Sequence, residues 1–419
     1  MNLKIPLTAS IKGAVVLPAS KSYSIRAHFV AACGGRSRIV GASDCDDAKV
    51  ARTVAQQLSR GACAHTFDVG ESGTSLRFLL PLLPYFSTMA KVTGRGTLVG
   101  RPNHHLCAAL RAHGLDIKGS GVKESVPITF KGGKVPCGCV KIDGSLSSQF
   151  ISALMIAAPL SGGDMRLVMT GKTLVSQDYV TMTRQILARA GIRVLVRGKR
   201  EFFIPGAQTF KGLKDFHVPS DYGLAAFFMA AAALVPSDVT LKGYFDDRLV
   251  QSDGAILRFL KHMGVKMVRT STGIRIKGPF DLKGGTFSLR DCPDLVPIMA
   301  VMAMFAKGVT RLKDIGHARV KESDRISDLR RELQKVGADI EEKPDELIIR
   351  GQGNFPSPLW GGVRGGGVVL DPHHDHRLAM AFAVLGLKVG ITVKDVECTS
   401  KSYPGFVNDF KKILVKHKQ

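Results

Sequence analysis

The stretch FHVPSDYGLAAFFMAAAAL, residues 216–234, decides the fold because it contains one complete structural unit. Apolar and polar residues alternate over its first three positions, which predicts a short strand. The polar elbow PSD, residues 219–221, favours a helix start because Ser and Asp are preferred N-caps. The run that follows is apolar on nearly all sides, which is typical of a buried helix.

Five other stretches follow the same order of strand, polar elbow and apolar helix. They are AVVLPASKSYSIRAHFVAAC (14–33), FDVGESGTSLRFLLPLL (67–83), VKIDGSLSSQFISALMIAAPL (140–160), TFSLRDCPDLVPIMAVMAMFAKG (286–308) and VVLDPHHDHRLAMAFAVLGLK (368–388). Amphipathic helical stretches such as YVTMTRQILARAG, residues 179–191, lie between successive copies. Six βαβαβ-type repeats therefore predict one pseudo-symmetric α/β architecture.

Composition limits the class of protein. The chain has 419 residues, 45% of them hydrophobic, which predicts two or three domains with large cores. The net charge of +24 is spread over many segments, which favours either nucleic acid or small anionic substrates. One Trp and six Tyr supply few stacking platforms, so small anionic substrates are the prediction and nucleic acid is not.

The cysteines and the apolar runs predict the cellular compartment of the protein. Eight cysteines are dispersed along the chain, which fits reduced thiols in the cytoplasm better than a disulfide framework. The first residues, MNLKIPLTASIKG, lack the apolar core of a signal peptide. The longest apolar run, about residues 224–235, is shorter than the roughly 20 residues that span a bilayer. We expect a cytoplasmic protein without membrane contact.

The elbows themselves predict anion binding. Each elbow precedes a helix N-terminus, where unpaired backbone N–H groups and the helix dipole attract negative charge. Ser and Asp at these positions are also ordinary caps. Several elbows add a cation that a cap does not need, namely Lys21, Arg26, Arg77 and Arg377. Cations in these positions point to phosphate or carboxylate ligands.

The sixth elbow, DPHHDHR at residues 371–377, has the composition of a metal site. Its adjacent histidines would point to opposite faces of an extended segment, and no second Cys/His cluster completes a ligand shell. Comparison with the other elbows indicates that Arg377 is the working residue, with His376 and Asp375 in capping and supporting roles. We predict no metal here.

Motifs at these elbows resemble a known family. In chain order they are LPASKSYSIRA, SGTSLRF, GRP at 100–102, DGSLSSQF, LVSQDY, CPDLVP, RVKESDR, DHRLAMAF and CTSKSYP. Together they resemble the EPSP synthases (3-phosphoshikimate 1-carboxyvinyltransferases) of the enolpyruvyl transferase family, from about Pro18 to Phe406. The resemblance rests on the whole ordered set, because each motif alone is weak.

The resemblance implies a two-globe inside-out α/β barrel with three repeats in each globe. One globe would hold residues 20–218, and the other 1–19 together with 219–419. Substrates would bind in a cleft that closes over them. The implied reaction moves the enolpyruvyl group of phosphoenolpyruvate onto the 5-hydroxyl of shikimate 3-phosphate, by addition and elimination of phosphate. It needs no metal or organic cofactor, and the protein would act as a monomer.

The resemblance also assigns residues. Shikimate 3-phosphate contacts would be Lys21, Ser22, Arg26, Ser147, Ser148, Gln149, Ser176, Tyr179, Asp294, His317 and Lys321. Phosphoenolpyruvate contacts would be Lys21, Gly73, Arg101, Gln149, Arg325, Arg377 and Lys401. The implied catalytic residues are Asp294, Lys21, Glu322 and Lys321. Asp294 would be the base for the 5-hydroxyl, and Glu322 and Lys321 are alternatives for the proton shuttle to the enolpyruvyl carbon.

The sequence departs from the family pattern in four places. Glu71 stands where Asn is common beside the phosphate, and would repel the ligand unless it turns away or pairs with a cation. Phe78 replaces a frequent Pro, and His317 a frequent Asn. The Pro/Gly-rich segment 351–367 is longer than the family needs, and is expected to be an exposed loop.

Two alternatives remain open at this point. The sister enzyme that acts on UDP-N-acetylglucosamine usually carries Lys-Asn at the first elbow and a Cys shortly before the Arg-Pro pair. This chain has Lys21-Ser22 and no Cys in TGRGTLVGRP, residues 93–102. The other alternative is a nucleic-acid-binding protein related to RNA-phosphate cyclase, which has similar repeats. The scarcity of aromatic residues counts against it.

Overall fold

The computed structural model describes residues 1–60, 66–171, 174–353 and 367–415. The chain forms two compact units. Unit 1 contains Met1–Pro18, Pro219–Asp246 and Gln251–Gln419, and unit 2 contains Ala19–Val218 and Asp247–Val250. The boundaries expected from the sequence differ by one residue at the first junction and by the segment 247–250, which packs with unit 2. Residues 354–366 of the expected loop lie outside the described residues.

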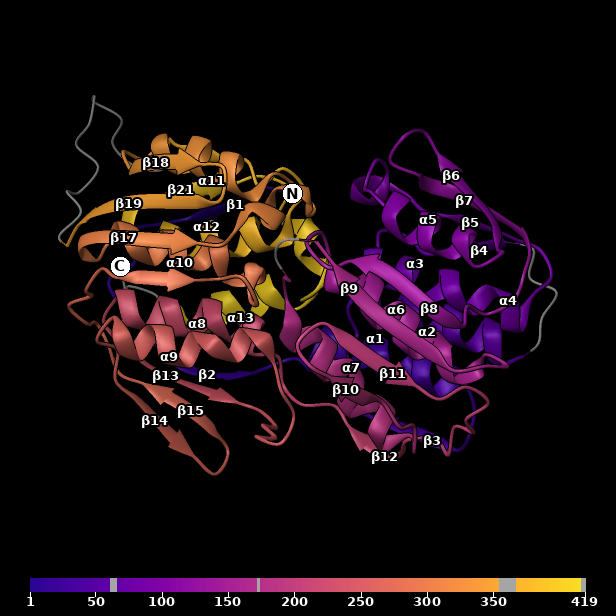
Figure 1. Ribbon diagram of the computed structural model, residues 1–419. Coiled ribbons are helices and arrows are strands. Elements are labelled where there is room, and N and C mark those ends of the chain that lie inside the picture. Colours follow the sequence, from indigo (N-terminus) through magenta and orange to yellow (C-terminus); the bar gives the residue numbers. More distant parts are fainter. Residues whose placement is uncertain (61–65, 172–173, 354–366, 416–419) are drawn as a thin grey trace. The chain divides into compact units, whose positions relative to one another are not determined.

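Each unit has three buried helices, one after each predicted elbow. Unit 2 contains α1 (Lys21–Ala32), α3 (Gly73–Leu79) and α6 (Ser148–Ala157), and unit 1 contains α8 (Tyr222–Leu234), α10 (Val296–Met304) and α12 (His376–Val389). Every residue of α8 and α10 is buried, as their continuous apolar runs predict. In unit 1 these three helices contact one another and form the centre of the core (Figure 1).

Small sheets cover the buried helices. In unit 1 the strand orders are β1-β21-β20, β14-β15-β13-β2 and β16-β17-β19-β18, and in unit 2 they are β10-β11-β9-β8, β12-β3 and β4-β5-β7-β6. Unit 1 uses β1 (Leu3–Ile5), β2 (Ile11–Val16), β13 (Ser237–Lys242), β14 (Met267–Thr270), β15 (Gly273–Ile276), β16 (Thr286–Ser288), β17 (Lys307–Lys313), β18 (Asp339–Lys343), β19 (Glu346–Gln352), β20 (Val369–Leu370) and β21 (Ile391–Val393). Unit 2 uses β3 (Ser37–Val40), β4 (Thr66–Asp68), β5 (Ala90–Thr93), β6 (Asp116–Ser120), β7 (Ser125–Gly132), β8 (Gly138–Asp143), β9 (Met165–Thr170), β10 (Leu195–Arg197), β11 (Glu201–Ile204) and β12 (Lys214–His217). Helices are thus inside and sheets outside, the reverse of an ordinary α/β barrel.

Strand pairing shows where the repeats exchange partners. In four repeats the strand that enters the buried helix pairs in parallel with the strand that leaves it: β4 with β5, β8 with β9, β16 with β17 and β20 with β21. The other two repeats, where the chain passes from one unit to the other, swap partners. There β2 pairs with β13, and β12 pairs with β3, again in parallel.

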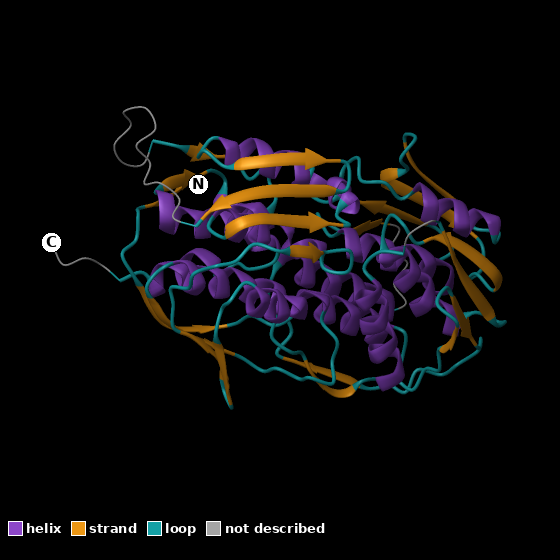
Figure 2. Cartoon of the chain, turned by 60° about the vertical axis from the view of Figure 1, so that its left-hand side comes forward, coloured by secondary structure: helices purple, strands orange, loops and turns teal. Residues whose placement is uncertain are grey.

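Amphipathic helices lie between the repeats along the chain, as the sequence predicts. Figure 2 shows the helices of the chain in purple and the strands in orange. They are α2 (Asp46–Ser59), α5 (His104–Ala112), α7 (Gln177–Arg189), α9 (Ala255–His262) and α11 (Arg325–Gln334). The last four are followed by Gly114, Gly191, Gly264 and Gly337, all with positive φ, which is the left-handed conformation that commonly ends a helix. The chain also forms α4 (Leu83–Phe86), α13 (Phe406–Ile413) and the 3₁₀ turns η1 (Leu80–Leu82), η2 (Gly96–Leu98), η3 (Ala158–Leu160) and η4 (Ser252–Gly254).

The described helices include none that combines the length and the apolar character required to cross a bilayer.

Candidate active site

Five of the six predicted elbows are capped by a side chain, which accounts for their Ser and Asp residues. Ser20, Ser72, Ser147, Asp221 and Asp375 each accept a hydrogen bond from a backbone N–H in the first turn. The elbow before α10 differs, because it forms a 3₁₀ turn, η5 (Pro293–Leu295), without a side-chain cap. Its acid, Asp294, instead binds two arginines.

Arg325 is the centre of a charge cluster in unit 1. Its guanidinium reaches three carboxylates: Nε lies 2.7 Å from Asp375 Oδ2, Nη1 lies 2.7 Å from Asp294 Oδ1, and Nη2 lies 3.1 Å from Glu322 Oε2. The side chain is only 1% exposed. Burial lowers its pKa, but the three carboxylates outweigh burial and raise the pKa well above its usual value. Glu322 lies three residues before Arg325, and both side chains of this pair are largely buried.

Asp294 is held in its ionised form by this cluster. Besides Arg325, it accepts from Arg377 Nη2 at 3.2 Å, and Lys321 Nζ lies 4.0 Å from Oδ1. Burial raises the pKa of Asp294, but Arg377, Arg325 and Lys321 together hold it well below the ordinary value. A carboxylate in this state is a weak base, and it becomes a stronger one only when an anion binds the surrounding cations.

Two short turns bring the remaining cations and His317 to unit 1's cluster. Lys321 follows η6 (Gly316–Val320), and Lys401 ends η7 (Val396–Lys401), where its Nζ lies 3.7 Å from Glu322 Oε1. His317, on η6, has its pKa lowered to about 3, first by burial and then by Lys321, so its imidazole is neutral. Its Nε2 is buried, and none of the described residues forms a hydrogen bond with it.

The sixth elbow separates its histidines from its arginine. His373 lies on the side of α11, with Nε2 3.3 Å from Glu332 Oε1. His374 is exposed, and both residues have positive φ. His376 and Arg377 are buried at the start of α12, while Asp375 caps that helix and also binds Arg325. No group of three His, Cys, Asp or Glu side chains in the described ranges is arranged to hold a metal ion.

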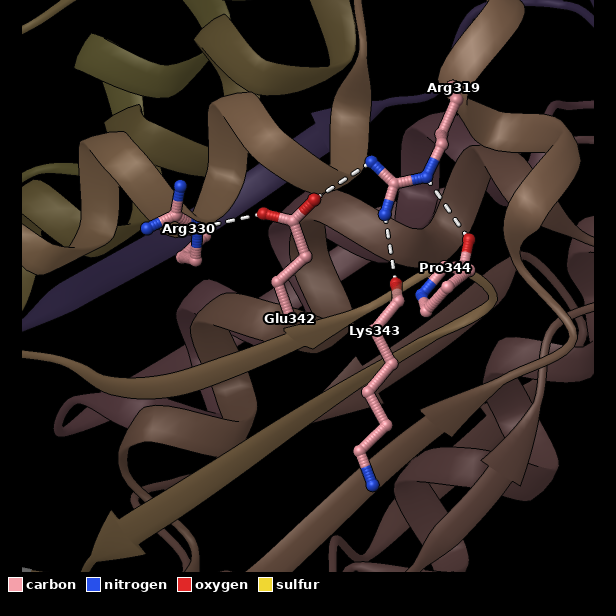
Figure 3. Close-up of a pocket in the computed structure, with 5 residues that line it drawn as sticks. All are labelled: Arg319, Arg330, Glu342, Lys343 and Pro344. Atoms are coloured by element: carbon pink, nitrogen blue, oxygen red, sulfur yellow. Dashed lines mark hydrogen bonds and ion pairs between the residues drawn. The ribbon is translucent and has the colours of Figure 1, made fainter.

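Hydrogen bonds around a surface pocket hold the RVKESDR motif, residues 319–325, in place. The pocket is about 670 Å³ in volume and is lined by Arg319, Arg330, Glu342, Lys343 and Pro344 (Figure 3). Arg319 donates to Glu342 Oε1 at 2.8 Å and to the carbonyls of Lys343 and Pro344, and Arg330 donates to Glu342 Oε2. These bonds tie the segment that carries Lys321 and Glu322 to β18.

Unit 2 contains a second group of the predicted residues, at the start of α1. Lys21, the first helical residue, lies 3.0 Å from Asp47 Oδ2. Arg26 is 1% exposed and donates to Thr183 Oγ1 and to the carbonyls of Ser22 and Tyr179. Burial lowers its pKa to about 10, which still leaves it charged at neutral pH.

Gln149 links two elbows of unit 2. Its Oε1 accepts from Arg77 and its Nε2 donates to Thr74 Oγ1 at 2.9 Å. Arg77 also donates to Asn103 Oδ1 and to the carbonyl of Pro102. Arg77 therefore positions neighbouring side chains within the protein, a role that the cation pattern of the elbows does not predict. These bonds hold Gln149 in place.

Gly73 and Arg101 fit together because Gly73 has no side chain. A Cβ built on Gly73 would lie 2.9 Å from Nη1 of Arg101, closer than real Cβ contacts allow. Arg101 is 8% exposed. The glycine thus lets a guanidinium approach the N-terminus of α3 directly, where backbone N–H groups are available to an anion.

The serines predicted to contact shikimate 3-phosphate lie at helix starts. Ser147 and Ser148 begin α6, and Ser148 is buried. Ser176 is the residue before α7 and has φ of +56°, an unusual conformation for a non-glycine residue. Tyr179 lies one turn later, with its ring beside the Arg26 guanidinium at 5.7 Å.

The departures from the family pattern have local explanations. Glu71 Oε2 accepts from the backbone N–H and the hydroxyl of Thr97, so it fastens the loop that leads to Arg101. Phe78 is fully buried, packs edge-on against Phe29 and lies 5.5 Å from the Arg26 guanidinium.

Sequence patterns missed two acids and one amide that lie against charged residues of the elbows. Asp47 pairs with Lys21, and Asn103 binds Arg77. Asp253 lies at 7% exposure close to Arg377. None of the three belongs to an elbow, so the repeat did not identify them. The sequence offered one weak signal for Asp47 and Asn103, which stand next to charged or capping residues.

Comparison with known proteins agrees with this geometry. Residues 44–410 match the family described as EPSP synthase (3-phosphoshikimate 1-carboxyvinyltransferase). The chain belongs to the EPSP synthase family. The family, enolpyruvyl transferase fold and transferase class predicted from the nine ordered motifs are thereby confirmed.

Relatives and solved structures of EPSP synthases cover nearly the full chain. The 3-phosphoshikimate 1-carboxyvinyltransferases of Methanocaldococcus jannaschii and Clostridium beijerinckii are 34% and 32% identical, and each alignment covers 98% of this chain and 97–98% of the relative. The EPSP synthase structure from Acinetobacter baumannii matches with a TM-score of 0.78 and 26% identity, over 99% of this chain and 98% of that one. The enolpyruvyl transferase NikO from Streptomyces tendae shares the fold at a TM-score of 0.74 and 18% identity, with 98% of each chain covered.

Proposed function

We propose that this chain transfers the enolpyruvyl group of phosphoenolpyruvate to the 5-hydroxyl of shikimate 3-phosphate and releases phosphate, and that the two clusters described above bind the substrates. The observation that carries the assignment of roles is Asp294. Asp294 forms no helix cap. Among the elbow acids in the described part of the chain, it alone faces Arg325, Arg377 and Lys321 together.

The cations around Asp294 suit a base that gains strength when substrate binds. In the ligand-free protein, Arg377 and Arg325 keep the pKa of Asp294 low. A phosphate or carboxylate that binds these arginines would offset their charge, and the pKa of Asp294 would then rise. Asp294 would take the proton of the 5-hydroxyl at the moment when both substrates are present, which is general base catalysis.

Protonation of the enolpyruvyl carbon needs an acid near the same place. Lys321 lies 4.0 Å from Asp294, and Glu322 lies between Arg325 and Lys401. We propose Lys321 or Glu322 as the proton shuttle and Lys21 as an electrostatic contributor at the helix start of α1. Arg325, Arg377 and Lys401 would stabilise negative charge on the phosphoenolpyruvate part of the tetrahedral intermediate.

Each proposed ligand has its own set of binding groups. For shikimate 3-phosphate these are Lys21, Ser22, Arg26, Ser147, Ser148, Gln149, Ser176 and Tyr179, with His317 and Lys321 from unit 1. For phosphoenolpyruvate, Lys21, Gly73, Arg101 and Gln149 of unit 2 would act with Arg325, Arg377 and Lys401. Supporting this, Ser148 is buried at the start of α6, and the buried Arg101 approaches Gly73 at the start of α3, where an anion is stabilised by backbone N–H groups. Arg26 is buried in the second turn of α1.

The proposal is tested by phosphate release from the purified chain. Release is expected only when phosphoenolpyruvate and shikimate 3-phosphate are both present, and the organic product should carry the enolpyruvyl ether. UDP-N-acetylglucosamine in place of shikimate 3-phosphate should give no release. Release with the nucleotide sugar but not with shikimate 3-phosphate would overturn the proposal and favour the sister activity.

We also propose that the protein acts as a cytoplasmic monomer on small anions rather than on nucleic acid. The free cysteines among the described residues fit a reducing compartment. Light scattering of the purified chain and filter binding to RNA and DNA at physiological salt would test these two points, because nonspecific nucleic-acid binding weakens steeply as salt increases.

A further inference from the structure

Asp253 is a buried acid beside the charge cluster of unit 1 that no step above uses. It lies in η4, just before α9, and is 7% exposed. A Cβ built on Gly223 would lie 2.3 Å from Asp253 Oδ2 and 2.9 Å from Arg377 Nη1. The carboxylate and the guanidinium therefore approach the same face of Gly223, at the start of α8, and only a glycine leaves room for both.

One oxygen of this carboxylate has no hydrogen-bond partner in the described part of the chain. Oδ1 is buried, and no described residue forms a hydrogen bond with it. A buried ionised carboxylate with an unpaired oxygen is costly, whereas the neutral acid is tolerated. Burial with an unpaired oxygen therefore favours the protonated form of Asp253. The same does not hold for Asp294, which has two arginines at bonding distance.

The charged groups around Asp253 come from four elements. Asp294 of η5 and Asp221 at the start of α8 repel its negative charge, while Arg377 of α12 and Lys321 after η6 attract it. A Cβ built on Gly254, the residue after Asp253, would lie 3.7 Å from the ring of Tyr222 of α8. Burial is the largest influence, and together they raise the pKa of Asp253 to about 7. Two acids near one guanidinium thus have pKa values pushed in opposite directions, a pattern that often separates proton-holding and proton-accepting roles.

We propose that Asp253 is a positioning residue that takes up one proton from solvent when an anionic group of phosphoenolpyruvate binds Arg377, and so keeps the guanidinium available to that anion. The inference rests on the proposed function. An anion at Arg377 offsets the charge that attracts the Asp253 carboxylate, so an O–H bond forms on Asp253 and the repulsion between two neighbouring anions disappears. An ionised Asp253 would instead compete with the ligand for Arg377.

The first test is the pH dependence of the Michaelis constant for phosphoenolpyruvate at saturating shikimate 3-phosphate. In the wild type this constant should rise between pH 7 and pH 9, by up to about tenfold per pH unit for one linked proton. Asp253→Asn mimics the protonated acid, so its constant should stay flat near the wild-type value at pH 6.5. The ligand's own phosphate titrates near pH 6 and affects both proteins alike.

Asp328→Asn is the matched control. Asp328 is also a buried acid of unit 1 whose pKa is raised by burial, but it lies on α11 beside Arg331 and His373. This variant should keep the wild-type pH profile. An Asp253→Asn profile that parallels the wild type, or a uniform loss of affinity at every pH, would overturn the inference, because either result describes a structural role only.

A second measurement separates this inference from the proposed function. Infrared difference spectra of the wild type should show a protonated carboxyl band that titrates near pH 7 and moves to higher pH when inorganic phosphate is added as the probe. The band should persist in Asp328→Asn and be absent in Asp253→Asn. A wild type without a phosphate-sensitive band overturns the inference even if the enzyme makes product. Failure to make product overturns the proposed function, whatever the spectra show.

Discussion

Replacing Arg325 by Met should destabilise unit 1 by about 3–5 kcal/mol at pH 8, because it leaves carboxylates buried without their cation. The side chain is 1% exposed and contacts Asp294, Glu322 and Asp375, the last of which is 0% exposed. Methionine keeps most of the volume, so the loss reports on charge rather than on a cavity. For a unit of this size, the expected fall in the unfolding temperature is roughly 6–20 °C.

The same change should be less damaging in acid. In the wild type, the depressed pKa of Asp294 contributes stability above the unfolded pKa, and this stability is lost as the pH falls through the folded pKa. Without Arg325 the pKa of Asp294 should rise, so that carboxylate protonates at a higher pH and its cost disappears. The difference in unfolding free energy between variant and wild type should therefore shrink from pH 8 to pH 5.

Thermal and urea unfolding followed by circular dichroism at both pH values would measure this effect. Arg311→Met is the control: it removes a partly exposed pair with Glu346 and should cost about 0–1 kcal/mol at either pH. A loss below 1 kcal/mol for Arg325→Met, or a loss that does not change with pH, would refute the view that buried charge pairing organises this cluster.

Three further predictions test the site. Asp294→Ala should lower turnover by about 10²–10⁴-fold while the dissociation constant for shikimate 3-phosphate, measured by calorimetry, changes little; an unchanged turnover number would remove Asp294 from the mechanism. Arg377→Ala should raise the Michaelis constant for phosphoenolpyruvate by roughly ten- to a hundredfold, with or without EDTA, whereas His373→Ala should change it little; the reverse ranking, with rescue by zinc, would indicate a metal site. Gly73→Ala places a Cβ 2.9 Å from Arg101 and should raise the Michaelis constant for phosphoenolpyruvate by about tenfold in steady-state assays. An unaltered Michaelis constant would show that Arg101 does not bind phosphoenolpyruvate.

The repeat accounts for most of what the sequence could predict. Six elbows followed by apolar runs located the six buried helices, since a helix that is apolar on all sides has no stable place except a core. The caps at Ser20, Ser72, Ser147 and Asp375 followed from residue type alone. The exception at Asp294 could not be read from composition, because whether an acid caps a helix or faces an arginine depends on where a distant segment places that arginine.

Contacts between side chains far apart in the chain were the part that the sequence could not supply. The bond from Arg325 to Asp375 joins residues 50 positions apart, and the bond from Arg77 to Gln149 joins residues 72 apart. The elbow pattern marked Arg77 as an anion ligand, whereas in the fold it orients an amide. The swapped pairing of β2 with β13 was equally hidden, because parallel strands carry no local mark of which partner they will find.

The pairing of β1 with β21 also bears on how the chain folds during its synthesis. β1 pairs with β21, whose residues 391–393 are added about 390 residues after β1 itself. At about 5–20 residues per second, the ribosome needs roughly 20–80 s to deliver that partner. Throughout this interval the first strand has an unpaired edge, while unit 2 can already complete its sheets. A translational pause, or a chaperone bound to the nascent β1, would therefore affect the yield of unit 1 much more than that of unit 2.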